Sequence, residues 1–153
     1  MNDQGISETR FRVRYAETDQ MGVVYHSNYL IWFEIGRVEM MRELGFDYKH
    51  MEIEDGCFIS VVDARCRFKS PALYDDLILV RTHINRMRET MVHFSYEVFR
   101  DGDKTILCEG ETTHISTGRD FKIKKMPEKY VAAFREAMRR HRAASQTEGT
   151  LVL

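Results

Sequence analysis

Residues 15–29 combine a carboxylate, an imidazole and a glycine in a short polar segment that precedes a long apolar run. Asp19 and His26 lie seven positions apart, with Gly22 between them. The apolar run is predicted to be helical, and the first N–H groups of a helix lack partners within it and carry the positive end of its dipole. A carbonyl oxygen that develops negative charge would be stabilised at that end. Asp19 could attack such a carbonyl or activate water, and its low basicity requires an activated acyl donor such as a thioester.

The same residues also have a purely structural interpretation. An Asp in a loop before a helix commonly forms an Asx turn, and Ser27 or Asn28 is a plausible helix N-cap. His26 is one of six scattered histidines, most of which are expected to be surface or satisfied core residues. Residue types and spacing alone leave both interpretations of Asp19 and His26 open.

A strand on one side and a helix on the other are predicted to hold this segment. Residues 9–15 alternate between apolar or polar side chains and three arginines, which is the period of a half-buried strand. Residues 28–44 contain no proline, and Gly45 supplies a helix stop. The first half of this run is apolar on nearly every side, so we expect the helix to be buried. Glu34 and Arg37 are expected on its exposed second half, where they can support each other.

The rest of the chain is predicted to form strands with short turns and a final helix. The expected strands cover residues 58–69, 77–86, 92–98 and 105–117. Pro127 can open a short amphipathic helix with the apolar stripe Tyr130, Val131, Phe134 and Met138. Short turns favour antiparallel neighbours, so we predict an α+β fold with an antiparallel sheet of five to six strands folded around one long central helix.

Two sequence runs resemble a known family. The run ETDQMGVVYHSNYLIWFE, followed by GRVEMMRELG, resembles the signature of the 4-hydroxybenzoyl-CoA thioesterase family, and the later FKSPALYDDLILV is similar to it as well. The resemblance covers residues 11–125 and is nearest to bacterial acyl-CoA thioesterases of the type associated with the Tol-Pal system. It implies the hotdog fold and hydrolysis of an acyl-CoA thioester, with no cofactor beyond the coenzyme A of the substrate.

The resemblance also implies roles for individual residues. In the family, the Asp that matches Asp19 is catalytic, as nucleophile or general base. The residue that matches His26 opens the central helix, and its backbone N–H polarises the thioester carbonyl. We add Tyr25 to the catalytic candidates. Asn28 and Phe68 join the candidates for binding the substrate.

Basic residues are expected to meet the phosphates of coenzyme A. In the family, the turn between the third and fourth strands supplies such contacts, and it matches residues 86–90 here. Arg86 and Arg88 are therefore the candidates, and Met87 stands where some relatives have a second Arg. A second candidate patch comprises Lys122, Lys124 and Lys125. The alternative for both groups is a solvated charged face.

Two other functions and an assembly state follow from the predicted fold. A hydratase acting on enoyl thioesters is one alternative, although such enzymes use a differently placed Asp and His. A non-catalytic protein that binds acyl thioesters or acts as a scaffold is the other. The edge strands of a single wrapped sheet need covering. The resemblance implies pairing of such edges, so we expect a homodimer or homotetramer with sites lined by two chains.

Composition narrows the class further. The 153 residues have the length of one domain, expected to span 1–153 with loose ends at 1–7 and 143–153. The 23 Lys and Arg against 24 Asp and Glu argue against a nucleic-acid binder. The longest apolar stretch, 29–35, is too short for a transmembrane helix, and no signal core precedes it, so we expect a cytoplasmic protein. No metal-ligand spacing occurs, and three cysteines without a CxxC pair are expected to be reduced, with Cys66 facing the core.

Overall fold

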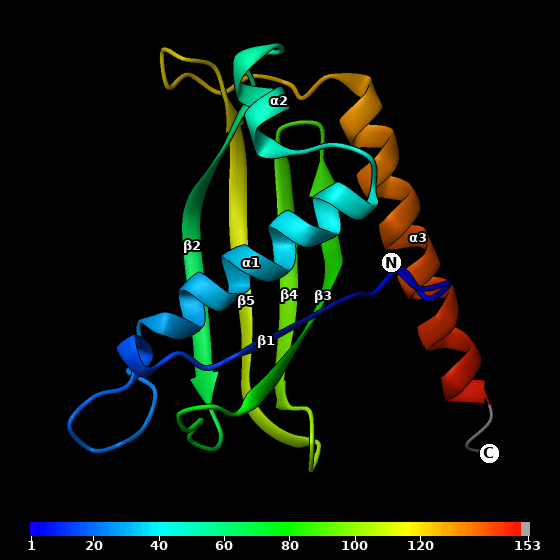
Figure 1. Cartoon of the computed structure of the whole chain (residues 1–153). Coiled ribbons are helices and arrows are strands. Elements are labelled where there is room, and N and C mark those ends of the chain that lie inside the picture. The colour runs from blue at the N-terminus through cyan, green and yellow to red at the C-terminus, as the bar shows by residue number, and fades with distance from the viewer. Residues whose placement is uncertain (151–153) are drawn as a thin grey trace.

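The computed structural model describes residues 1–150, and the side chains of residues 1–147 (Figure 1). The elements in chain order are β1 (Ser7–Arg12), the 3-10 helix η1 (Tyr15–Glu17), α1 (Asn28–Glu43), α2 (Tyr48–Ile53), β2 (Phe58–Phe68), β3 (Leu77–Arg88), β4 (Met91–Arg100), β5 (Thr105–Thr117) and α3 (Glu128–Thr150). The five strands form one antiparallel sheet in the order β1-β3-β4-β5-β2. Helix α1 lies across one face of this sheet (Figure 1), which confirms the predicted α+β fold of the hotdog kind.

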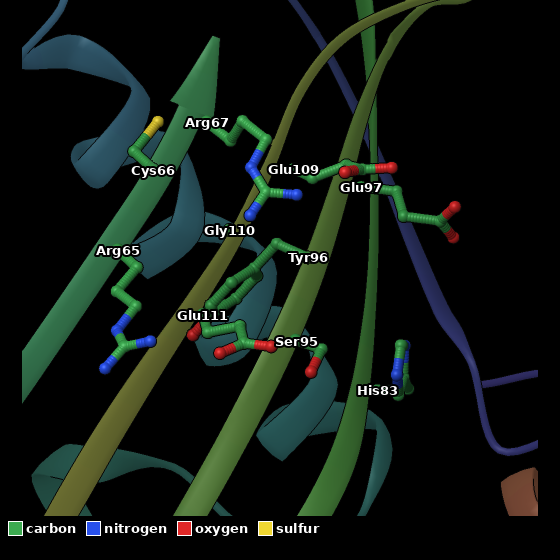
Figure 2. A pocket seen from close by; sticks show the side chains of 10 residues that line it. All are labelled: Arg65, Cys66, Arg67, His83, Ser95, Tyr96, Glu97, Glu109, Gly110 and Glu111. Atoms are coloured by element: carbon green, nitrogen blue, oxygen red, sulfur yellow. The ribbon is translucent and has the colours of Figure 1, made fainter.

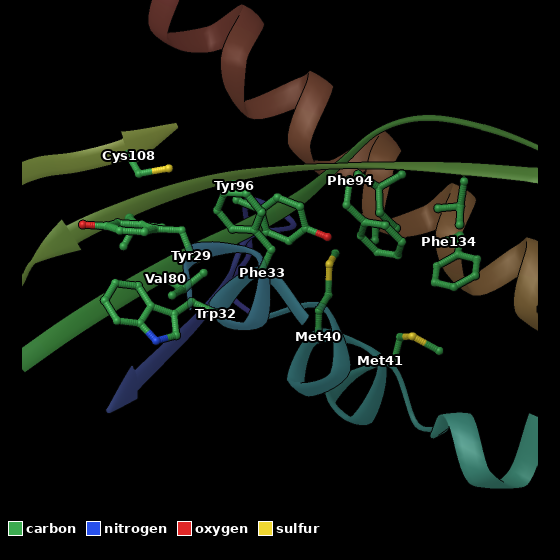
Figure 3. Close-up of a cluster of buried hydrophobic side chains, with 14 of the residues drawn as sticks. Tyr29, Trp32, Phe33, Met40, Met41, Val80, Phe94, Tyr96, Cys108 and Phe134 are labelled. Carbon is green, nitrogen blue, oxygen red and sulfur yellow. The ribbon is translucent and has the colours of Figure 1, made fainter. Parts of the chain in front are cut away.

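Alternate side chains of the central strands form the sheet's half of the core. The fully or almost fully buried positions are Ile78, Val80, Thr82 and Ile84 in β3, and Val92, Phe94, Tyr96 and Val98 in β4. Helix α1 supplies the other half with Trp32, Phe33, Met40 and Met41 (Figure 3). The ring of Phe33 stacks on Tyr96 with centroids 4.5 Å apart. Phe33 fits there because Gly110 of β5 has no side chain, and a Cβ at that position would overlap the Phe33 ring.

The strand order corrects the expectation that each strand pairs with the next. Strands β3, β4 and β5 do pair in succession, but β2 pairs with β5 and β3 lies beside β1. Residues 69–76 therefore cross the end of the sheet. Lys69 N and Ser70 N donate to Leu107 O, and Val13 N donates to Asp76 O. These backbone bonds hold the connection in place without a tight turn.

Two apolar surfaces are exposed in the single chain. Strand β2 is a sheet edge, and Val61, Val62 and Phe68 on it are about half exposed. On α1, Leu30 and Ile31 are 44% and 45% exposed. The expectation of an almost wholly buried helix is therefore wrong, because the sheet covers only one side of α1.

Arg37 is buried rather than on the exposed half of α1, and it does not pair with Glu34. Its Nε donates to Tyr48 Oη at 3.0 Å, and its Nη1 lies 3.4 Å from Tyr96 Oη. Burial raises the pKa of Tyr96 to about 12, so this phenol stays protonated. Tyr48 opens α2, which was not predicted because six residues show no clear period. The guanidinium thus joins α1 to α2 and to β4.

The chain ends are more ordered than expected. Ile6 and Ser7 are buried, and the α-amino group of Met1 pairs with Glu43, because the first residues pack between α1 and α3. Helix α3 is 23 residues long rather than short, and residues 143–150 belong to it, while 151–153 lie outside the described residues. Its predicted apolar stripe is confirmed at Tyr130, Val131 and Phe134, which are buried. Across residues 1–150, no helix is both long and apolar enough to span a membrane.

Replacing Gly110 by alanine should destabilise the fold by about 1–3 kcal/mol, because the added methyl group overlaps the stacked Phe33 ring. Gly102→Ala is the matched control, since a Cβ there meets nothing within 4 Å, and we expect a change within about 0.5 kcal/mol. Urea unfolding midpoints measure both variants. Equal stability of the two would contradict the close packing of α1 on the sheet.

Candidate functional site

The loop between η1 and α1 folds back on itself around Asp19. Asp19 Oδ1 accepts a hydrogen bond from Met21 N at 2.8 Å, and the Asp19 carbonyl accepts one from Gly22 N at 3.0 Å. Gly22 has a φ of +78°, which favours glycine. The expected Asx turn is therefore present. It uses only Oδ1, and Oδ2 has no hydrogen-bond donor within the part of the chain that the structure describes.

A buried carboxylate that the sequence analysis missed holds this loop to the helix. Glu17 is 4% exposed. Its Oε2 accepts from Arg14 N at 2.7 Å, and its Oε1 accepts from Trp32 Nε1 at 3.0 Å. Burial opposes the charged form, but these hydrogen bonds and the Arg14 guanidinium outweigh it and hold the pKa of Glu17 below its usual range. The bond to Arg14 N also turns the chain into η1, which is why β1 ends at Arg12 rather than at residue 15.

The main chain of Glu17 fixes the start of α1. Its carbonyl oxygen accepts from Tyr25 N and from Asn28 Nδ2, both at 2.9 Å. Asn28, predicted to bind substrate, thus uses its amide to support the loop. Ser27 adopts helical angles and makes no side-chain cap. Within residues 1–150, the N–H groups of His26 and Ser27 donate to no protein acceptor, so the helix presents free donors.

The Asp19 loop and the residues around the start of α1 line one pocket of about 320 Å³. It is lined by Asp19, Met21, Val23, Val24, His26, Tyr29, Phe68, Lys69, Ser70 and Pro71. The structure thus brings together three predicted site residues, Asp19, His26 and Phe68. Tyr25 does not line the pocket, and its ring lies 4.2 Å from the ring of His26. Lys69 and Ser70 were not predicted, because only the crossing connection brings them here.

One wall of the pocket is aromatic and rests on the crossing connection. The ring of Tyr29 lies 5.2 Å from that of Phe68 and 4.7 Å from that of Trp32. Tyr29 Oη accepts a hydrogen bond from Ala72 N, and Ala72 O accepts one from Val24 N. Burial raises the pKa of Tyr29, so its hydroxyl stays neutral. The Asp19 loop, α1 and residues 69–76 therefore form one connected wall.

The predicted phosphate-binding arginines lie elsewhere in the chain. Arg86 and Arg88 are at the far end of β3, whereas β3 begins beside the site at Leu77, which pairs with Arg12. They line a hollow of about 380 Å³, together with Arg142 of α3, which sequence analysis missed. A single chain therefore does not bring these arginines to Asp19.

The second candidate patch is partly engaged in contacts within the chain. Lys125 Nζ lies 2.7 Å from Glu89 Oε2, and Lys124 Nζ donates to Asp55 O at 3.2 Å. Among the described residues, no three His, Cys, Asp or Glu side chains gather as they would around a metal ion.

A larger hollow of about 600 Å³ lies on the face of the sheet away from α1 (Figure 2). Its lining includes Arg65 and Arg67 of β2 and acidic side chains of β4 and β5 (Figure 2). On the same face, Arg81 Nη1 lies 3.6 Å from Glu97 Oε1 and Arg81 Nε lies 3.5 Å from Glu8 Oε1. Opposite charges face each other between most neighbouring strands, whereas Glu97 of β4 lies opposite Glu109 of β5. Cross-strand charge pairs of this kind are typical of a solvated sheet face.

The chain is similar to known proteins in both sequence and fold. A model of the Thioesterase-like superfamily matches residues 13–134. The chain is 35% identical to the putative acyl-CoA thioesterase YneP of Bacillus subtilis, over 75% of this chain and 82% of that one. It is 31% identical to the acyl-CoA thioester hydrolase YbgC of Escherichia coli, over 82% and 92%. The crystal structure of a DHNA-CoA thioesterase from Staphylococcus aureus has a TM-score of 0.81 at 31% identity, over 94% of this chain and 95% of that one.

Replacing Glu17 by Gln should lower the free energy of unfolding by about 1–3 kcal/mol at neutral pH, because a neutral amide satisfies fewer of the buried donors. The pKa of Glu17 in the folded protein lies below its ordinary value of 4.5. The advantage of the wild type is therefore complete above that ordinary value and is lost as the pH falls through the folded pKa.

Urea unfolding followed by the fluorescence of Trp32, the sole tryptophan, at neutral pH and in acid measures this difference. Glu34→Gln on the exposed side of α1 is the control and should change little. A difference for Glu17→Gln that persists unchanged in acid would show that the charge is not what matters.

Proposed function

The chain belongs to the thioesterase-like superfamily, and from this premise we propose that it hydrolyses an acyl-CoA thioester to the free acid and coenzyme A. The observation that carries the proposal is that Asp19 and His26 line one pocket at the start of α1, where the N–H groups of His26 and Ser27 donate to no protein acceptor within residues 1–150. The relatives named as acyl-CoA thioesterases support the same reaction class.

Asp19 is the proposed reacting carboxylate. Its Oδ1 is held by Met21 N, which fixes the carboxylate, and Oδ2 is left to act on the thioester carbon or on a water molecule. In either case water supplies the hydroxyl of the acid, and the sulfur of coenzyme A leaves as the thiol. We propose no metal or other cofactor, so EDTA should leave the rate unchanged.

The N-terminus of α1 is the proposed oxyanion site. The N–H groups of His26 and Ser27 donate to no protein acceptor within residues 1–150, and the positive end of the helix dipole lies there. Such donors stabilise the negative charge that develops on the thioester oxygen. Backbone groups supply this interaction, so the His26 side chain serves the site as a wall of the pocket. Tyr25 supports that wall through its contact with the imidazole.

The acyl group is proposed to lie against the apolar wall formed by Tyr29 and Phe68, with Met21 beside it. Tyr29 is buried, whereas Phe68 and Met21 are exposed in the single chain. Leu30 and Ile31 on α1 and Val61 and Val62 on β2 are exposed as well. We propose that a second copy of the chain covers these surfaces in a homodimer or homotetramer.

A second copy of the chain would also bring the arginines of one chain close to Asp19 of the other. We propose that Arg86, Arg88 and Arg142 of one chain bind the phosphates of a coenzyme A whose thioester lies at Asp19 of the other. Three guanidinium groups around one hollow suit a ligand with several phosphates. Arg142 is held there because its Nη2 donates to Asn85 O at 3.2 Å.

Asp19→Asn should lower kcat with an acyl-CoA substrate by about 100-fold or more, because the amide keeps the size and the Asx turn but is neither nucleophile nor base. Asp120→Asn is the matched control, since Asp120 Oδ1 accepts from Lys122 N in a similar turn outside the pocket, and its rate should be unchanged.

Release of free thiol from a panel of acyl-CoA thioesters measures both variants. Full activity of Asp19→Asn at saturating substrate would refute the mechanism. Saturable binding without turnover by the wild type would instead favour a non-catalytic binding protein, and addition of water to crotonyl-CoA would favour a hydratase.

Arg142→Ala should raise KM for acyl-CoA by roughly threefold to tenfold and leave kcat nearly unchanged, because it removes one phosphate contact far from the reacting atoms. The effect should shrink at high salt, where exposed charges are screened. Arg139→Ala is the control, since Arg139 lies on the same helix and pairs with Glu136.

The acyl thioester of pantetheine lacks the phosphates of coenzyme A, so it distinguishes a lost phosphate contact from an effect on folding or assembly. The KM for this truncated substrate should be the same for the wild type and for Arg142→Ala. A parallel rise in KM for this truncated substrate would show that Arg142 acts on folding or assembly rather than on phosphate.

A further inference from the structure

Two free thiols face each other on the core side of β2 and β5. The sulfur atoms of Cys66 and Cys108 are 3.0 Å apart, although the residues are 42 positions apart in the chain. Both cysteines are free, and the third, Cys57, precedes the other end of β2, where its Sγ contacts Ser116 Oγ. The pair therefore forms a distinct site, and the reaction proposed above does not use it.

The two thiols differ in exposure and in acidity. Cys108 is 0% exposed, whereas Cys66 is only partly buried on the edge strand (Figure 2). A hydrogen bond from Cys108 stabilises the thiolate of Cys66 and lowers its pKa. The same contact, together with burial, raises the pKa of Cys108. Cys66 thus has the character of an attacking thiolate, and Cys108 that of the thiol that resolves its oxidised form.

We propose that Cys66 and Cys108 are a site of reversible oxidation by hydroperoxides, which closes a disulfide next to the acyl pocket. In the first step the Cys66 thiol loses its proton, the thiolate attacks one oxygen of hydrogen peroxide, and the O–O bond breaks. The hydroxide that leaves takes up a proton, so a sulfenic acid and water form. In the second step Cys108 attacks the sulfenic sulfur, an S–S bond forms, and a second water leaves. The sulfur pair loses two electrons and the peroxide gains them, so that 2 RSH + H₂O₂ gives RSSR + 2 H₂O.

The strand register makes this disulfide strained and hence reversible. Cys66 pairs with Gly110 and Phe68 pairs with Cys108, so the two cysteines are diagonal neighbours. Diagonal Cα atoms in a sheet are about 7–8 Å apart, which exceeds the usual Cα separation of a disulfide. Closing the bond must therefore draw β2 and β5 together at this point. Strained disulfides are the readily reduced ones.

Movement of β2 at this point reaches the pocket directly. Phe68 lies two residues after Cys66, lines the pocket and packs on Tyr29. Leu107, which precedes Cys108, accepts hydrogen bonds from the N–H groups of Lys69 and Ser70, two further lining residues. Cys108 and Tyr29 also belong to the same buried cluster (Figure 3). Oxidation should therefore displace the aromatic wall and lower activity.

The test treats the reduced full-length protein with hydrogen peroxide, quenches it and measures intact mass and the linked peptide. We expect the loss of two hydrogen atoms, a Cys66–Cys108 cross-linked peptide, and full reversal by dithiothreitol. The fluorescence of Trp32, which lies against Tyr29, should shift with the oxidation. Acyl-CoA hydrolysis should fall by about tenfold in kcat/KM, and only this readout rests on the proposed function.

Cys66→Ser and Cys57→Ser are the matched variants. The protein should tolerate Cys66→Ser because residue 66 is partly exposed. This substitution should abolish the cross-link, the fluorescence shift and the loss of activity on treatment with peroxide. Cys57→Ser should retain all three. Oxidation of the wild type to sulfinic acid without a cross-link would contradict the proposal that Cys66 and Cys108 form a disulfide. A cross-link that leaves Trp32 fluorescence unchanged would overturn its coupling to the pocket.

Discussion

The carboxylate of Glu17 lies almost wholly buried and accepts hydrogen bonds from the main chain of Arg14 and the indole of Trp32. The carbonyl of the same residue holds Tyr25 N and the Asn28 side chain. One residue thus fixes where β1 stops, where α1 starts and how the loop between them is shaped. Because these hydrogen bonds hold the loop to the start of α1, Asp19 and His26 line one pocket.

The site is also shaped by what a single chain leaves uncovered. Asp19 lies near the start of β3, and the arginines lie at its other end, so one chain cannot place both on one coenzyme A. Of the exposed apolar side chains, Phe68 of β2 lines the pocket, and Leu30 and Ile31 of α1 directly follow Tyr29, which lines it too. Both facts have the same explanation if two copies of the chain complete each other's sites.

Local features were predicted from the sequence, and features that depend on distant contacts were not. The helix from Asn28 to Glu43 follows from a run without proline that ends at Gly45, and the strands β3 and β4 follow from the alternation of their side chains. Asp19 and His26 share a pocket because they are close in the chain. The roles of Glu17 and Arg142 were missed, since a buried carboxylate and a distant helix acquire their meaning only through partners elsewhere in the fold. Leu30 and Ile31 were placed in the core because a pattern shows that a surface is apolar but not which chain covers it.

The most direct test is a crystal structure of the Asp19→Asn variant with a non-hydrolysable acyl-CoA analogue. We expect the carbonyl oxygen of the analogue to accept hydrogen bonds from the N–H groups of His26 and Ser27. We expect the phosphates to bind Arg86, Arg88 and Arg142 of a second copy. A carbonyl placed away from the start of α1, or phosphates bound without the second copy, would contradict the proposed site.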